Sequence, residues 1–193
     1  MDIGAGDGRY VYRLARRDPE SFFVGVDPNA QALAGCSARA ARKPARGGLA
    51  NVAYVQAAVE GLPHELDGLA HEVHVSFPWG HLLRGLVVAE PAFLRGIPRI
   101  CRRDALLQIV LTYSAAYESA MVVELGLPEL SLDYIDSVLA PAYARHGLHI
   151  FERRLATPED LREVATSWGK RLLARRRRDV YVIRARAMKG RQG

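Results

Sequence analysis

The chain has 193 residues, of which 49% are hydrophobic and 25% charged, a balance that suits one soluble domain built around a single core. No apolar run approaches the ~20 residues that a membrane helix needs, and no signal peptide is visible, so we expect no membrane contact and a cytoplasmic location. The two cysteines, Cys36 and Cys101, form neither a disulfide framework nor a metal pattern. We therefore expect both to be buried and no metal site.

The net charge of +6 is concentrated near one end of the chain. Residues 166–193 hold 10 of the 27 basic residues and one acid, Asp179, which leaves 17 basic against 20 acidic residues in 1–165. Four consecutive arginines, Arg175 to Arg178, directly precede a predicted strand. A solubilising tail is one explanation of such a run. Because the run is attached to a folded element, a phosphate backbone is the partner that it favours.

A glycine-rich turn, Asp2-Ile3-Gly4-Ala5-Gly6-Asp7-Gly8, stands near the start and is followed by an amphipathic run. This pattern predicts a strand that turns sharply into a helix whose first N–H groups are free to bind a ligand. A dinucleotide fold would prefer G-x-G-x-x-G. Asp7 would repel a pyrophosphate but suits a cationic ligand with an amino group. The turn therefore favours S-adenosylmethionine over a nucleotide.

The next two predicted strands end in further candidate ligand contacts. Asp27 closes a strand about 20 residues beyond the glycines, the spacing at which an acid meets a ribose diol. A helix N-cap before Pro28 is the other role open to Asp27. Val59 and Glu60 lie in a loop at the carboxyl edge of the third strand, where α/β folds keep their ligands. Glu60 would act through a water or by bracing this loop.

Strands alternate with helices along the rest of the chain, which predicts an α/β fold with a mainly parallel sheet. Only three residues precede the first glycine, so the first strand is short, and we expect residues to be missing upstream. The predicted strands are 22–27, 52–56, 71–77, 105–112, 148–155 and 180–187. The predicted helices are 8–18, 29–43, 91–102, 131–146 and 158–165, and the fourth of them is expected to be bent or split at Pro141. We also predict an insertion at 114–128 and an exposed linker at 167–171.

Both tryptophans, Trp79 and Trp168, lie in predicted loops. Core packing is the usual role of either one alone, but two indole faces together suit a base extruded from its stack. The segment from Ser76 to Trp79 has no carboxylate or amide to accept hydrogens from an exocyclic amine. A ring nitrogen with a lone pair needs no base and only in-line placement. An aromatic sandwich would also stabilise a cationic methylated product.

Four segments together resemble a known family: 2–9, 43–49, 77–80 and 167–172. They are similar to the aminoglycoside-resistance methyltransferases of 16S ribosomal RNA, and within these to the group that modifies adenine-1408 at N1. The resemblance covers nearly the whole chain in the same order. It departs at the N-terminus, where the family carries more residues, including a small hairpin.

The resemblance implies one class I methyltransferase domain over 1–193 with a seven-stranded sheet, S-adenosylmethionine as cofactor, and the 30S subunit as partner of a monomer. It implies that Trp79 and Trp168 flank the flipped adenine and that 156–178 is an RNA-contacting linker. The implied cofactor contacts are Asp2, Gly4, Ala5, Gly6, Asp27, Val59, Glu60, Ser76, Phe77, Pro78, Trp79, Gly80, His81, Thr166, Ser167 and Trp168. The implied RNA contacts are Arg42, Lys43, Arg46, Lys170, Arg171, Arg176 and Arg178.

Two other functions stay open from the sequence. A tRNA guanine-N7 methyltransferase has a related fold and a similar glycine turn. A non-catalytic RNA-binding protein of the same fold would keep the basic end but lack the donor site. Binding of S-adenosylmethionine and the choice between tRNA and 30S subunits as acceptor separate the three.

Overall fold

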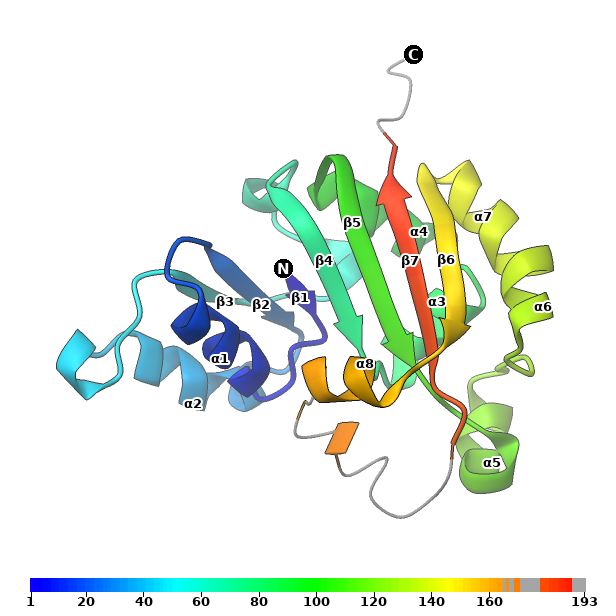
Figure 1. Ribbon diagram of the computed structural model, residues 1–193, viewed down its shortest axis with the longest axis horizontal. Helices are drawn as coiled ribbons and strands as arrows, with labels where there is room; N and C mark the ends of the chain where they lie inside the picture. Colours follow the sequence, from blue (N-terminus) through cyan, green and yellow to red (C-terminus); the bar gives the residue numbers. More distant parts are fainter. Residues whose placement is uncertain (165, 167–168, 171–177, 189–193) are drawn as a thin grey trace.

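The structure is a computed structural model that describes residues 1–164, 166, 169–170 and 178–188. Within these ranges seven strands form one sheet in the order β3-β2-β1-β4-β5-β7-β6, with helices on both faces (Figure 1). The pairs β2–β3, β1–β2, β1–β4 and β4–β5 are parallel, whereas β7 is antiparallel to both β5 and β6. The predicted α/β fold with a mainly parallel sheet is confirmed.

The strands are β1 (Asp2–Ile3), β2 (Phe23–Asp27), β3 (Val52–Gln56), β4 (Ala70–Ser76), β5 (Cys101–Leu111), β6 (Leu148–Leu155) and β7 (Tyr181–Ala187). The helices are α1 (Arg9–Arg17), α2 (Ala30–Ala40), α3 (Gly80–Val87), α4 (Pro91–Ile100), α5 (Ala115–Glu124), α6 (Leu132–Tyr134), α7 (Ala140–Arg145) and α8 (Pro158–Glu163). Short 3₁₀ turns lie at Pro44–Arg46, Val59–Gly61 and His64–Leu66. No helix in the described ranges is long and apolar enough to cross a membrane.

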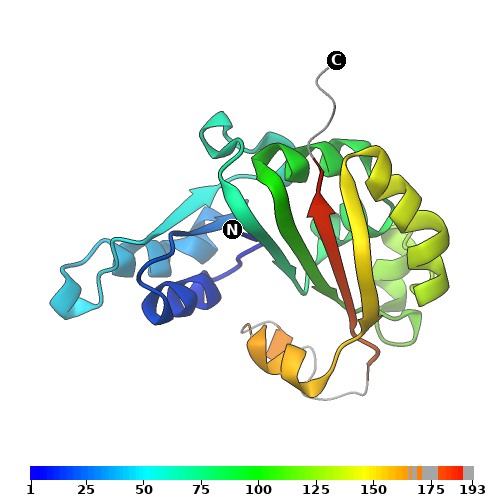
Figure 2. The ribbon, with the colours of Figure 1, turned by 45° about the horizontal axis from the view of Figure 1, so that its top comes forward.

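Separate apolar clusters hold the helices on the sheet. The largest one joins Leu86 of α3, Ile97 of α4 and Tyr143 of α7 to the sheet, and all three are at most 1% exposed. A second cluster packs α1 and α2 on β3, and a third places Phe77 and Val164 beside β5 and β7. In Figure 1, α3 and α4 lie behind the sheet, and α8 lies in front of the carboxyl ends of β4 and β5; the turned view of Figure 2 keeps α8 at these ends.

Several predicted element boundaries agree with the structure, and others differ from it. Strands β3 and β6 have the predicted bounds. The predicted helix 29–43 ends at Ala40, and a separate 3₁₀ turn follows. Helix α3 was not predicted, because Gly80 and Gly85 give this segment low helix propensity; burial of its apolar face stabilises it instead. Part of the predicted insertion forms α5, which is kinked at Glu118.

The bend that Pro141 predicted is present. Residues Ile135–Leu139 form a π-helical turn between α6 and α7. Proline has no N–H to donate and its ring would clash with the carbonyl four residues earlier, so the regular ladder cannot run through this point. The two cysteines are buried, as the sequence predicted, and are not joined to each other.

Candidate functional site

The glycine turn lies at the carboxyl end of β1, in the middle of the sheet. Gly4, Gly6 and Gly8 all have positive φ angles, of 78°, 56° and 68°, which explains why glycine stands at each position. The N–H of Gly4 donates to the carbonyl of Val26 over 2.8 Å and fixes the turn to β2. A Cβ on Gly4 would lie 2.4 Å from Leu82 of α3, whereas a Cβ on Gly6 would meet no described atom within 4 Å. The turn is thus closed toward α3 and open at Gly6.

Asp27 braces this turn. Its Oδ2 accepts a hydrogen bond from the Gly6 N–H over 2.8 Å, and its Oδ1 accepts one from the Asn29 N–H over 2.8 Å. The N-cap of α2 is Asn29, whose side-chain oxygen accepts a hydrogen bond from the Ala32 N–H. The N-cap role considered for Asp27 therefore belongs to Asn29. Each carboxylate oxygen of Asp27 keeps a second lone pair for a ligand.

Asp2 is a buried carboxyl beneath the turn. It is 6% exposed, and its Oδ1 has no hydrogen-bond partner among the residues that the structure describes. Burial raises the pKa of Asp2 to about 7, against the opposing field of the N-terminal ammonium and with a further contribution from Asp27. A buried acceptor without a partner is costly. A ligand that brings an ammonium group to Asp2 would relieve this cost.

The loop after β4 carries the first tryptophan. Phe77 adopts a φ of 52°, which is rare for a residue with a bulky side chain, and its N–H donates to the Val110 carbonyl over 2.7 Å. The strained backbone turns the chain so that Trp79 directly precedes α3 with 42% of its surface exposed. Ser76 is half-buried, Pro78 is buried and His81 is exposed. Trp79 is therefore not part of the core.

Part of the linker before β7 packs against this same loop. Gly169 is buried, and a Cβ at this position would lie 2.4 Å from the Phe77 ring. The Gly169 N–H donates to Thr166 Oγ1 over 2.8 Å, which holds the two residues in one turn. The predicted contacts Ser167 and Trp168 lie outside the described residues. Gly169, the next described residue, lies against Phe77 of the β4 loop, which is far away in the sequence.

The Val59 loop is the next candidate contact along the sheet edge. Val59 is 5% exposed and packs in the main core, while Glu60 is exposed. A Cβ on Gly96 of α4 would lie 2.4 Å from the Val59 carbonyl, so this helix fits closely against the loop. Helix α4 therefore fixes the loop and leaves Glu60 facing solvent.

The predicted RNA contacts differ in how they are presented. Arg42, Lys43 and Arg46 are all exposed around the 3₁₀ turn, and Lys170 is exposed as well. Arg178 is not presented to solvent: its side chain is 7% exposed and forms an ion pair with Glu118. Its guanidinium also lies over the Tyr117 ring, 5.0 Å from the centroid. Arg171 and Arg176 lie outside the described residues.

Two residues near the site were not singled out in the sequence. Leu82 of α3 packs closely against Gly4 of the glycine turn, and α3 is a helix that was not predicted. Glu118 lies within the segment treated as an insertion, and its kinked backbone gave no signal in the sequence. Among the described residues no cluster of three or more His, Cys, Asp or Glu side chains could hold a metal ion.

Comparisons with known proteins show the family of this chain. A family model described as NpmA, 16S rRNA (adenine(1408)-N(1))-methyltransferase, matches residues 1–187. The 16S rRNA (adenine(1408)-N(1))-methyltransferase of Streptoalloteichus tenebrarius is 40% identical over 185 residues, which are 95% of this chain and 84% of that protein. The protein of the same description from Escherichia coli is 35% identical over 184 residues, with the same two shares of 95% and 84%.

A crystal structure of a protein of the same description is similar to this chain in fold and sequence. The 16S rRNA (adenine(1408)-N(1))-methyltransferase of Catenulisporales acidiphilia, solved as a mutant with its cosubstrate S-adenosylmethionine, has a TM-score of 0.89 and 37% identity to this chain, covering 100% of this chain and 86% of that one. The chain therefore belongs to the NpmA family of 16S rRNA (adenine(1408)-N(1))-methyltransferases.

Proposed function

We propose that this protein transfers a methyl group from S-adenosylmethionine to N1 of adenine-1408 in the 16S rRNA of the 30S subunit, and so confers aminoglycoside resistance. The observation that carries the proposal is the contact between Gly169 and Phe77. It brings Gly169, which follows Trp168 in the sequence, to the loop that contains Trp79, beside the glycine turn. A flipped base would be received between these two segments.

The residues of the turn fit the cofactor. Asp2 offers a buried carboxylate oxygen to the ammonium group, and Asp27 offers its remaining lone pairs to a ribose diol. The open side of Gly6 leaves space above the turn for a ligand to approach the backbone. Val59 and Glu60 would border the adenine end of the cofactor. When bound, S-adenosylmethionine supplies an electrophilic methyl group.

The protein's part in the chemistry is positioning. Adenine N1 carries an in-plane lone pair, so no residue has to remove a proton before it reacts. The segment 76–79 contains no carboxylate or amide that would accept hydrogens from an exocyclic amine instead. Holding two reactants in line supplies roughly 7–11 kcal/mol at best. The indole of Trp79 would stack on the base and stabilise the positive charge of the product by about 0.5–2 kcal/mol.

The RNA is held by its phosphates. Arg42, Lys43 and Arg46 are exposed together on one turn, and Lys170 is exposed beside the β4 loop. Arg178 would join them only by leaving Glu118. We place the protein in the cytoplasm as a monomer, because the assembled 30S subunit is found there and the described candidate contacts all come from one chain. Light scattering of the purified protein tests the monomer.

Incubation with 30S subunits and labelled S-adenosylmethionine, followed by reverse transcription, tests the function. A methyl group on N1 blocks base pairing, so we expect a stop at position 1408. Free tRNA as the better acceptor would support guanine-N7 methylation instead. Absence of S-adenosylmethionine binding in calorimetry would support a non-catalytic RNA-binding protein.

A further inference from the structure

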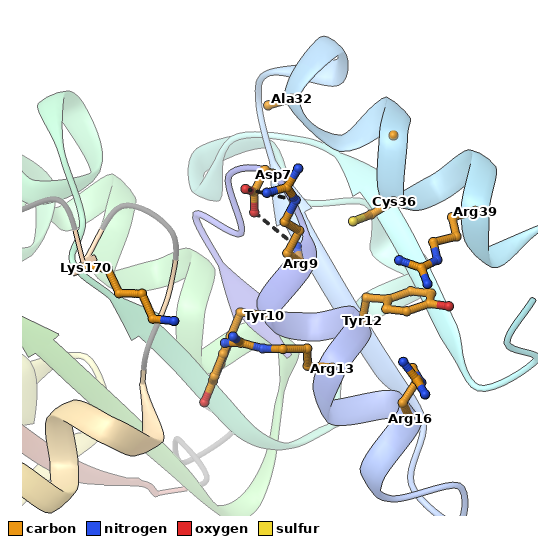
Figure 3. Close-up of a pocket in the computed structure, with 11 residues that line it drawn as sticks. Asp7, Arg9, Tyr10, Tyr12, Arg13, Arg16, Ala32, Cys36, Arg39 and Lys170 are labelled. Atoms are coloured by element: carbon orange, nitrogen blue, oxygen red, sulfur yellow. Dashed lines mark hydrogen bonds and ion pairs between the residues drawn. The ribbon is translucent and has the colours of Figure 1, made fainter. Parts of the chain in front are cut away.

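A groove between α1 and α2, beyond the candidate cofactor contacts, gathers positive charge (Figure 3). Its basic lining residues are Arg9, Arg13 and Arg16 of α1, Arg39 of α2, and Lys170. Among the described residues that line it, Asp7 is the one acid. We call it the α1 groove. Its volume of about 570 Å³ exceeds what a single small anion would fill.

The arginines of α1 form one stripe. Arg9, Arg13 and Arg16 are spaced by four and three residues, which places them on the same face of the helix. All three are exposed, and the sequence of α1 itself contains no Asp or Glu. From Arg9 to Arg16 the helix rises by about 10 Å. A nucleic-acid duplex carries a charge every few ångströms, so this length faces more than one phosphate.

Tyrosine rings support two of the guanidinium groups. Arg39 lies over the Tyr12 ring at 4.6 Å from its centroid, and Arg13 lies over the Tyr10 ring at 5.7 Å. Both rings belong to α1, and both residues are less than 10% exposed. A stacked guanidinium loses less freedom when it binds a phosphate, because its plane is already oriented.

The α1 groove connects two sets of predicted RNA contacts. Lys170, next to the β4 loop, lines the groove and faces α1 in Figure 3. Near Arg39, the Tyr12 hydroxyl donates a hydrogen bond of 2.5 Å to the Gly47 carbonyl, directly after the turn that carries Arg46. The groove thus has Lys170 at the side of the β4 loop, and Tyr12 links it to Gly47, the residue after the turn that carries Arg46.

We propose that the α1 groove binds the phosphate backbone of the substrate RNA between these two contacts, an inference that rests on the function proposed above. An anionic membrane is the less suitable partner, because stable surface binding also needs exposed apolar side chains and the aromatic rings of the groove are buried. Arg9 lies 3.7 Å from Asp7 of the glycine turn, so the test leaves this pair intact and changes Arg13 and Arg16.

The test compares 30S binding of the wild type, Arg13→Gln/Arg16→Gln, Arg13→Lys/Arg16→Lys and Arg95→Gln over a range of salt concentrations. Arg95 is an exposed arginine of α4, which packs in a different apolar cluster from α1, and serves as the control. Loss of two phosphate contacts should lower the slope of log affinity against log salt by about 1.5–2. At low salt the glutamine variant should bind at least tenfold more weakly, and Arg95→Gln should stay close to the wild type. The lysine variant keeps both charges but not the guanidinium over Tyr10, so it should keep the wild-type salt slope and bind with an affinity between those of the glutamine variant and the wild type.

The outcomes separate this proposal from the function. If the wild type methylates adenine-1408 and the glutamine variant keeps the wild-type slope, the α1 groove is not an RNA contact although the function holds. An equal loss in Arg95→Gln would show a general effect of net charge and overturn the proposal. The proposal would also be overturned if the glutamine variant lost binding to phosphatidylserine vesicles but bound 30S subunits like the wild type. If the wild type itself neither binds nor methylates 30S subunits, both proposals fail. Calorimetry with S-adenosylmethionine and thermal unfolding confirm that each variant is folded.

Discussion

The guanidinium of Arg178 lies 2.5 Å from the carboxylate of Glu118, and the two side chains are only 7% and 12% exposed. Glu118 also accepts the N–H of Ser114 over 3.0 Å, at the kink in α5. The pair therefore joins the helix after β5 to the residues that lead into β7. Arg178 Nε and Nη1 are buried without a hydrogen-bond partner among the described residues, so the pairing leaves part of the guanidinium unsatisfied.

Removing one member of this pair should destabilise the protein. Glu118→Gln leaves a buried cation without its counter-charge, and breaking such a pair costs about 3–5 kcal/mol of unfolding free energy. Arg178→Gln should cost a similar amount, and the double variant should cost less than the sum of the two. Urea unfolding of the four proteins measures the coupling. Additive losses would show that the ion pair contributes no coupling energy.

Asp2 should make the stability of the ligand-free protein depend on pH. Its pKa is about 7 in the folded state against 3.8 for the free side chain, so the folded state binds a proton that the unfolded state has lost. Stability should therefore fall as the pH rises from about 4 through about 7. Asp2→Asn should abolish this fall and raise the unfolding free energy at pH 8 by up to about 4 kcal/mol. Urea unfolding at pH 5 and pH 8 measures both. If the unfolding free energies of wild type and Asp2→Asn changed with pH in the same way, Asp2 would not be the cause of the pH dependence.

The same carboxyl should affect cofactor binding in the opposite direction. If the deprotonated Asp2 binds the ammonium group, affinity for S-adenosylmethionine should rise with pH up to about 7 and then level off. Between pH 8 and pH 6 we expect the affinity of the wild type to fall by about tenfold. Calorimetry at both pH values should show a weaker and nearly pH-independent affinity for Asp2→Asn. A variant that keeps the wild-type affinity would exclude the contact.

Trp79→Ala should reduce turnover far more than cofactor affinity. Stacking of a base on an aromatic ring is worth about 1–3 kcal/mol, which corresponds to a loss of roughly 5- to 150-fold. Trp79→Phe keeps a flat face and should retain most of the rate. Trp168→Ala should behave like Trp79→Ala if the two indoles share one base. Single-turnover methylation of 30S subunits gives the rate, and unchanged rates in both alanine variants would exclude the sandwich.

Gly169→Ala should displace the linker from the β4 loop. The new methyl group would lie 2.4 Å from the Phe77 ring, so either the ring or the linker must move. We expect at least a tenfold loss of 30S methylation with little change in overall fold. Gly61→Ala is the matched control, because its added Cβ would meet no described atom within 4 Å. Phe77→Leu in the Gly169→Ala background removes the clash and should restore part of the activity; no recovery would place the defect elsewhere.

Much of this architecture was predictable because its signals are local. The bounds of β3 and β6 follow from runs of β-forming residues, and the positive φ angles of Gly4, Gly6 and Gly8 explain the glycine pattern that indicated the turn. The split near Pro141 follows from the missing N–H of proline. In each case the physical cause lies within a few residues of its effect.

Other features depend on contacts between distant parts of the chain. The arginine run before β7 predicted exposed cations, yet Arg178 is buried against Glu118. The spacing of Arg9, Arg13 and Arg16 is visible in the sequence, but the contributions of Arg39 and Lys170 to the same groove are not. The fold class, the family and the residue types of the site could therefore be predicted from the amino-acid sequence. Which charges face solvent and which are paired became known only from the folded chain, because burial depends on the packing of segments that are far apart in the sequence.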